Sequence, residues 1–134
     1  MRIDGLPLTL LQLLISAFFA LTFLQSGLDK VFHRKGNAEY FAQVFGKGPL
    51  KPLSGLLLFG LTALELLTGA VNAAGGLAAL TGEGGLGTVG VALAALTMLS
   101  LCFGQRLAKD YAGAAGAVPY FLTALLGLYF YGLG

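Results

Sequence analysis

A single carboxylate interrupts the second of four long apolar segments in this sequence. The segment runs from Leu53 to Ala74, and Glu65 is its only ionisable residue. A charged side chain near the centre of a membrane-spanning helix costs about 2.5–3.5 kcal/mol on insertion scales, so such groups are kept where they pair or act on a substrate. Glu65 is therefore the candidate catalytic residue, as a group that exchanges protons. The competing interpretation is a neutral carboxyl that only joins two helices through a hydrogen bond.

Other polar residues at the ends of the apolar segments are candidates for orienting a substrate or an anion beside Glu65. They are Gln25, Lys30 and Arg106. Because Lys30 follows the first apolar segment, it is expected at the membrane edge, too far from Glu65 for easy pairing. Gln25, Thr22 and Ser16 lie deeper and are predicted to be the better hydrogen-bond partners of Glu65. The alternative for the basic residues is a solvated collar that contacts anionic lipid.

Residue types that hold redox cofactors are scarce. Cys102 is the only cysteine and His33 the only histidine, which excludes an intrachain disulfide and a haem held by two histidines of this chain. With Met1 and Met98 as the only methionines, no metal-ligand cluster is expected. The chain is therefore predicted to bind no metal and to carry no redox cofactor of its own.

The composition is that of a membrane protein. Of 134 residues, 57% are hydrophobic and only 10% charged, against about 25% charged in soluble domains. A bilayer core of about 30 Å needs roughly 20 apolar residues per helix, and the chain holds four such runs without the alternation of a β-barrel. We expect one all-α domain over residues 1–134, with spans at about 7–28, 53–74, 86–105 and 111–132.

A short amphipathic stretch separates the first two spans. Tyr40, Phe41, Val44 and Phe45 share one helical face, and the stretch is too short to cross a bilayer. It predicts an interfacial helix at about residues 37–46.

The basic residues predict the orientation of the chain. All lysines and arginines except Arg2 lie in residues 29–52 or 106–110. The positive-inside rule places these two loops in the cytoplasm and both termini outside, in a bacterial cytoplasmic membrane. The basic residues flank spans, which membranes require, so nucleic acid is not an expected partner.

Short motifs around the first loop resemble the DoxX-like family of four-helix membrane proteins. The first span ends in FLQSGLDK, a GxGPL motif follows, and the second span carries ELLTG. The residues concerned are Gly27, Lys30, Gly46, Gly48, Pro49, Glu65 and Gly69. Relatives in that family include small subunits of a thiosulfate:quinone oxidoreductase and membrane partners of redox-defence enzymes.

Two functions are compatible with these observations. The resemblance implies a membrane subunit of a quinone-linked oxidoreductase whose redox cofactors lie in partner chains. In that case a quinone headgroup would lie beside Glu65 and would be oriented by Gln25, Lys30 and Arg106. The alternative is a non-catalytic accessory subunit that contacts lipid and other subunits of a larger respiratory or photosynthetic complex. A small transporter is a weaker fit, since the sequence shows one intramembrane charge and no pair of broken helices.

Overall fold

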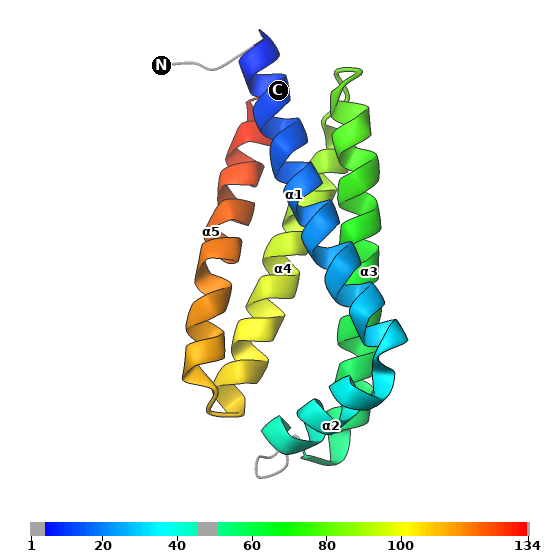
Figure 1. The fold of residues 1–134 in the computed structure, drawn as a ribbon. Coiled ribbons are helices and arrows are strands. Elements are labelled where there is room, and N and C mark those ends of the chain that lie inside the picture. The colour runs from blue at the N-terminus through cyan, green and yellow to red at the C-terminus, as the bar shows by residue number, and fades with distance from the viewer. Residues whose placement is uncertain (1–4, 46–50, 134) are drawn as a thin grey trace.

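The computed structural model describes residues 5–45 and 51–133, and over those ranges it is helical, without strands. The four longest helices lie side by side, and a shorter helix crosses beneath one end of them (Figure 1). The four are long and apolar enough to span a membrane, which confirms the predicted four-helix membrane bundle. They are α1 (Gly5–Phe32), α3 (Ser54–Ala79), α4 (Gly85–Leu107) and α5 (Tyr111–Gly132).

The connection between α1 and α3 contains α2 (Arg34–Phe45) and a single 3-10 turn, η1 (Lys51–Leu53). Helix α2 occurs where the interfacial helix is predicted, although it begins a few residues earlier. Phe41 and Phe45 are the buried residues of its apolar face. They pack on Leu58 of α3, as their spacing of four residues predicts, whereas Tyr40, expected on the same face, is 52% exposed. The Gly46–Pro49 turn expected from the sequence lies outside the described residues.

The outer surface of the bundle is apolar, as lipid contact requires. Leu6, Leu21, Phe32 and Phe59 are each at least 70% exposed. The bundle interior combines a hydrophobic core, which includes Phe19, Phe23 and Val91, with buried polar side chains. The latter include Ser16, Thr68, Asn72 and Thr97. Because lipid tails are as apolar as leucine, close packing and hydrogen bonds between helices replace the hydrophobic effect as the main source of association.

Helices α1 and α3 run antiparallel in very close contact. A Cβ added to Gly27 would lie 2.6 Å from Leu66 Cδ2, and one added to Gly69 would lie 2.9 Å from the backbone nitrogen of Leu24. Glycine is therefore required at both crossings, because a larger residue would push the helices apart. These pairs also set the register, in which the end of α1 at Phe32 lies opposite the region of Leu61.

This register leaves the first part of α3 without α1 beside it. At about 1.5 Å per residue, residues 54–60 extend roughly 10 Å beyond the end of α1. Helix α2 occupies part of that space, and its aromatic residues reach both Leu58 of α3 and Ala108 at the end of α4. Four helices therefore lie side by side along most of the bundle. At the end where α1 is absent, α2 lies beside α3 and the bundle is wider.

The opposite end of the bundle is closed by polar contacts and by direct backbone contact. Tyr131 of α5 bonds the Ser16 hydroxyl and donates to the Gln12 carbonyl of α1 at 3.1 Å. A Cβ added to Gly75 of α3 would lie 2.6 Å from the Cα of Gly87 in α4. The helices are therefore tied together at this end and separate toward the end that holds α2.

Helix α4 ends in a hydrogen-bonding pattern that usually contains glycine. The backbone nitrogen of Asp110 donates to Gln105 O at 2.8 Å, and that of Lys109 donates to Arg106 O at 3.1 Å. This is a Schellman motif, in which the residue after the C-cap adopts the left-handed conformation. Lys109 takes that position with φ = 62°. The Asp110 side chain then caps α5 by accepting from Gly113 N at 3.0 Å.

Candidate functional site

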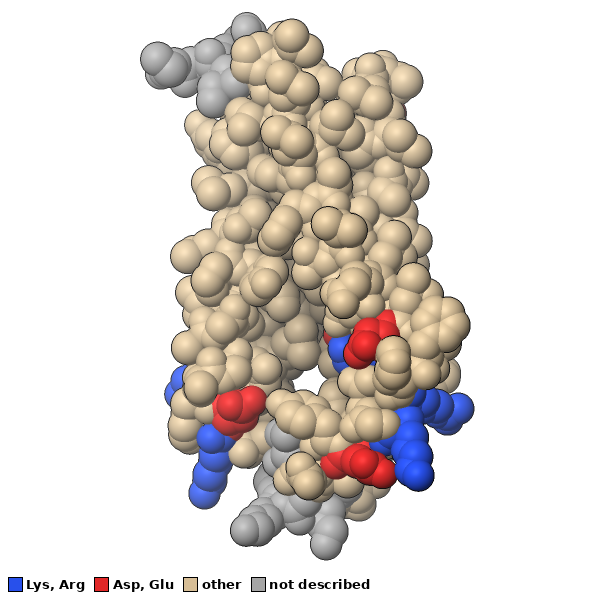
Figure 2. Space-filling view, viewed as in Figure 1, with Lys and Arg blue, Asp and Glu red and all other residues tan. Residues whose placement is uncertain are grey.

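The charged residues visible in Figure 2 gather at the wider end of the bundle, around α2 and the α4–α5 turn, and the surface is hollowed between them. A cavity of about 660 Å³ lies at this level. It occupies the space between the end of α1, α2, the first half of α3 and the last turns of α4. Its walls are mostly leucine and phenylalanine, with polar side chains from Ser26, Lys30, Asn37, Tyr40, Glu65, Ser100, Gln105 and Asp110.

Glu65 forms an ion pair with Lys30 in the wall of this cavity. The Lys30 Nζ atom lies 3.3 Å from Glu65 Oε1 and 3.4 Å from Oε2. The Glu65 side chain is 2% exposed and that of Lys30 is 14% exposed. Lys30 also donates to Ser26 Oγ, one helical turn earlier, at 2.9 Å. A buried carboxylate is thus paired with a cation whose remaining exposure is toward the cavity.

The prediction that Glu65 bonds Gln25, Thr22 or Ser16 in preference to Lys30 is wrong. It assumed that Lys30 lies at the same depth as the beginning of the second span. Since α1 ends opposite Leu61, in the first half of α3, Lys30 lies at the level of Glu65 instead. Ser16 is more than three helical turns away along α1 and bonds Tyr131.

Two other predicted site residues lie outside the cavity. Gln25 is exposed on the outer surface of α1. It precedes Lys30 by five residues, which places the two side chains about 140° apart around the helix. Arg106 is also exposed, and its guanidinium carbon lies 5.2 Å from the centre of the Tyr111 ring, a cation–π contact. The structure therefore brings Glu65 and Lys30 together and leaves Gln25 and Arg106 apart from them.

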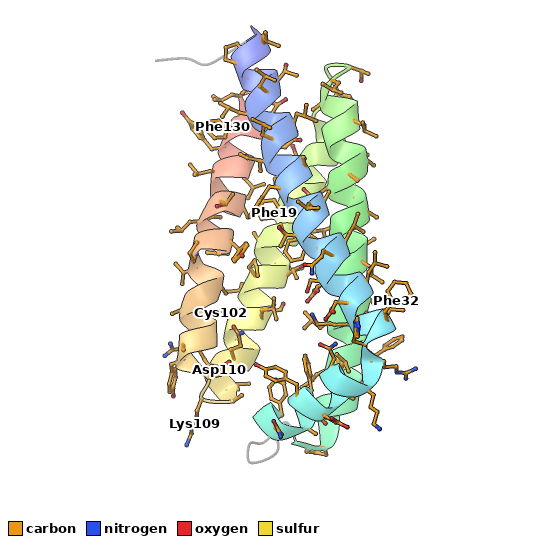
Figure 3. The ribbon with its side chains drawn as sticks, in the orientation of Figure 1. Phe19, Phe32, Cys102, Lys109, Asp110 and Phe130 are labelled. Atoms are coloured by element: carbon orange, nitrogen blue, oxygen red, sulfur yellow. The ribbon has the colours of Figure 1, made fainter. Side chains whose placement is uncertain are left out.

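The far wall of the cavity contains polar residues that the sequence did not single out. In the amide orientation that satisfies its hydrogen bonds, Gln105 donates to Gly113 O at 3.1 Å and to Leu101 O at 3.3 Å. Figure 3 shows Asp110 on the inner side of the α4–α5 turn, while Lys109 points away from the bundle. Gln105 and Asp110 are next to Arg106 and Lys109 in the sequence, and this was the signal that could have identified them as site residues. It is a weak signal, because adjacent residues point to different faces of a helix.

Four residues of the DoxX-like resemblance, Gly27, Lys30, Glu65 and Gly69, meet along the α1–α3 contact, and the GxGPL motif lies outside the described residues. Gly27 contacts α3 at Leu66, Gly69 contacts α1 at Leu24, and Lys30 pairs with Glu65. The two short motifs on α1 and α3 therefore form one structural unit at the cavity wall.

Comparisons with known protein families, with curated proteins and with solved structures find no match for this chain. Within residues 5–45 and 51–133, no three His, Cys, Asp or Glu side chains come close enough to hold a metal ion. The functional argument therefore depends on the geometry of the cavity and its ion pair.

Proposed function

We propose that this chain is a membrane subunit of a quinone-linked oxidoreductase that binds a quinone in the cavity beside Lys30 and Glu65. The observation that carries the proposal is the buried ion pair in the wall of a mostly apolar cavity. Small-molecule sites typically measure about 300–1,000 Å³ and combine apolar walls with a few polar groups that fix orientation. The resemblance to DoxX-like proteins supports the same assignment.

The hydrogen-bonding groups of the ion pair suit a quinone and its quinol. Charge-assisted N–H···O bonds are usually about 2.7–2.9 Å long, so the contacts of 3.3 and 3.4 Å between Lys30 and Glu65 are loose. An ammonium has three donors and a carboxylate about four acceptor positions. Lys30 therefore retains capacity to donate to a quinone carbonyl, and Glu65 retains capacity to accept from a quinol hydroxyl.

In the proposed reaction, this chain positions the ring and handles protons. Reduction of a quinone to its quinol consumes two electrons and two protons, and the electrons would come from a redox centre of a partner chain. Glu65 would exchange a proton with the ring oxygen, and Lys30 would stabilise negative charge on that oxygen. The leucine and phenylalanine walls would exclude water from both groups.

The proposed location is a bacterial cytoplasmic membrane, with α2 and the α4–α5 turn on the cytoplasmic side and both termini outside. The basic residues at this end support that orientation through the positive-inside rule. Its partners would be lipid and the redox subunits that supply electrons.

The deciding experiment is Glu65→Gln in the complex purified from native membranes with mild detergent, with co-purifying proteins and quinones identified by mass spectrometry. We expect quinone-dependent turnover to fall at least tenfold while the same subunits still co-purify. Glu39→Gln is the matched control, because Glu39 is exposed on α2. Full turnover in Glu65→Gln would contradict the proposal, and a loss of assembly instead would favour the accessory-subunit alternative.

A further inference from the structure

Part of the exposed cavity wall lies on one flank of the bundle, between α3 and α4. The most exposed apolar wall residues from these helices are Leu56 at 67%, Phe103 at 65% and Leu107 at 37%. Gly60 of α3 and Ser100 of α4 are exposed wall residues on the same two helices. None of these five residues is charged, so the rim of this opening is apolar apart from one hydroxyl.

The opening exists because the side-chain links between α3 and α4 lie only from the middle of the two helices toward the other end of the bundle. Thr68 and Thr97 hydrogen bond at 2.9 Å, and Asn72 Nδ2 donates to Gly90 O at 2.9 Å. Among the described residues, no side-chain hydrogen bond joins α3 to α4 between Thr68 and the start of α3. The two helices separate below this point, where the cavity begins.

Gly60 lies at the threshold of the opening. A Cβ added there would meet no atom within 4 Å, so this position faces open space. Gly60 is six residues from the start of α3, roughly 9 Å along the helix, which places it within the span and not at its end. The predicted spans cover residues 53–74 and 86–105, which include Leu56, Gly60 and Phe103, so an opening with an apolar rim at this level is expected to face lipid chains.

We propose that this opening is a lateral portal, and that the tail of a membrane-resident, isoprenoid-tailed quinone passes through it while the ring lies beside Lys30 and Glu65. The proposal rests on the function proposed above and adds the route and the class of ligand. A small water-soluble anion does not suit this route, since the rim offers it no charge and one hydroxyl. The ligand instead stays anchored in the bilayer throughout binding and release.

The test compares Gly60→Leu with Gly55→Leu in protein reconstituted in lipid nanodiscs. Gly55 is also an exposed α3 glycine with no atom within 4 Å of an added Cβ, but it is outside the cavity wall. We expect Gly60→Leu to weaken binding of a long-tailed isoprenoid quinone at least tenfold and binding of its tail-less analogue less than twofold. Gly55→Leu should change neither. Equal binding of the long-tailed quinone to the unmodified protein and to both glycine variants would contradict the portal.

A second measurement tests the portal independently of quinone binding. Failure of any quinone to bind would contradict the proposed function, but the portal could still be tested. A thiol is placed in the cavity wall by Leu64→Cys in a Cys102→Ala background, and its labelling by a membrane-partitioned maleimide is timed. We expect Gly60→Leu to slow labelling at least fivefold and Gly55→Leu to leave the rate unchanged. Equal rates in the two glycine variants would show that access does not pass Gly60 and would overturn the inference.

Discussion

Lys30 and Glu65 are 35 residues apart in the sequence, yet Nζ and Oε1 lie 3.3 Å apart in the wall of the cavity. The contact depends on the depth at which α1 ends. Helix α1 stops opposite Leu61, in the first half of α3, and α2 turns aside beneath it. The same early end creates both the ion pair and the space beside it, so the polar pair and the cavity are two consequences of one feature of the fold.

Removing the cation should destabilise the protein more than removing both charges. Lys30→Met leaves a carboxylate that is 2% exposed without a counter-ion, which typically costs about 3–5 kcal/mol. In Lys30→Met/Glu65→Gln no unpaired charge remains, and most of that loss should be recovered. The free energy of unfolding in detergent, measured for both single variants and the double variant, gives the coupling. Lys35→Met on the exposed face of α2 is the control, and strictly additive effects would contradict a direct ion pair.

Gly75→Ala should separate α3 from α4 at the closed end of the bundle. The added Cβ would lie 2.6 Å from Gly87 Cα and 2.8 Å from Gly87 N, and backbone atoms cannot rotate away as a side chain can. We expect a loss of about 1–3 kcal/mol in the free energy of unfolding. Gly55→Ala, in the same helix but facing open space, should be neutral or slightly stabilising. Equal stability of the two variants would contradict the close helix contact.

Tyr131→Phe should remove the hydroxyl-mediated hydrogen bonds between α5 and α1 and leave the bond from Gln12 Nε2 to Phe130 O in place. The Tyr131 hydroxyl bonds both the Ser16 hydroxyl and the Gln12 carbonyl, and the ring is 4% exposed. Interhelical hydrogen bonds in membrane proteins contribute roughly 0.6–1.7 kcal/mol, so a loss of about 1 kcal/mol is expected. Thermal unfolding in detergent measures it. Tyr129→Phe makes the same chemical change on a residue that is 58% exposed and should leave Tm unchanged.

Lys109→Gly should stabilise the protein. Lys109 adopts φ = 62° in the Schellman motif that ends α4, a conformation that costs a residue with a Cβ about 1 kcal/mol relative to glycine. The variant should therefore have a higher Tm, whereas Lys109→Ala, which removes the same charge but retains a Cβ, should not. An equal rise in Tm for both variants over the unmodified protein would show that loss of the charge, and not the backbone conformation, governs stability here.

The proposed orientation can be tested with single cysteines in a Cys102→Ala background. An impermeant maleimide added to intact cells should label Thr81→Cys in the α3–α4 loop and should not label Lys109→Cys in the α4–α5 turn. Permeabilised cells should show labelling at both positions. The reverse pattern in intact cells would place the basic end outside and contradict the positive-inside assignment.

Several features could be derived from the sequence because they depend on local pattern. The length and hydropathy of the apolar runs predict four spans, and the spacing of Phe41 and Phe45 predicts the buried face of α2. Gly27 and Gly69 indicated close helix contacts, because small residues permit them. Glu65 could be identified as a candidate site residue because inserting an ionisable group into a membrane span costs free energy wherever the group lies in the span.

The partner of Glu65 was decided only by the tertiary structure. Hydropathy reports how long each apolar run is, but it does not report the depth at which one helix ends beside another. That depth follows from the contacts of Gly27 with Leu66 and of Gly69 with Leu24, which set the register between α1 and α3. The register brings Lys30 to Glu65, directs Gln25 outward and leaves the beginning of α3 uncovered. The cavity, its opening past Gly60 and the ion pair in its wall therefore arise from long-range packing, which the local pattern of the chain does not encode.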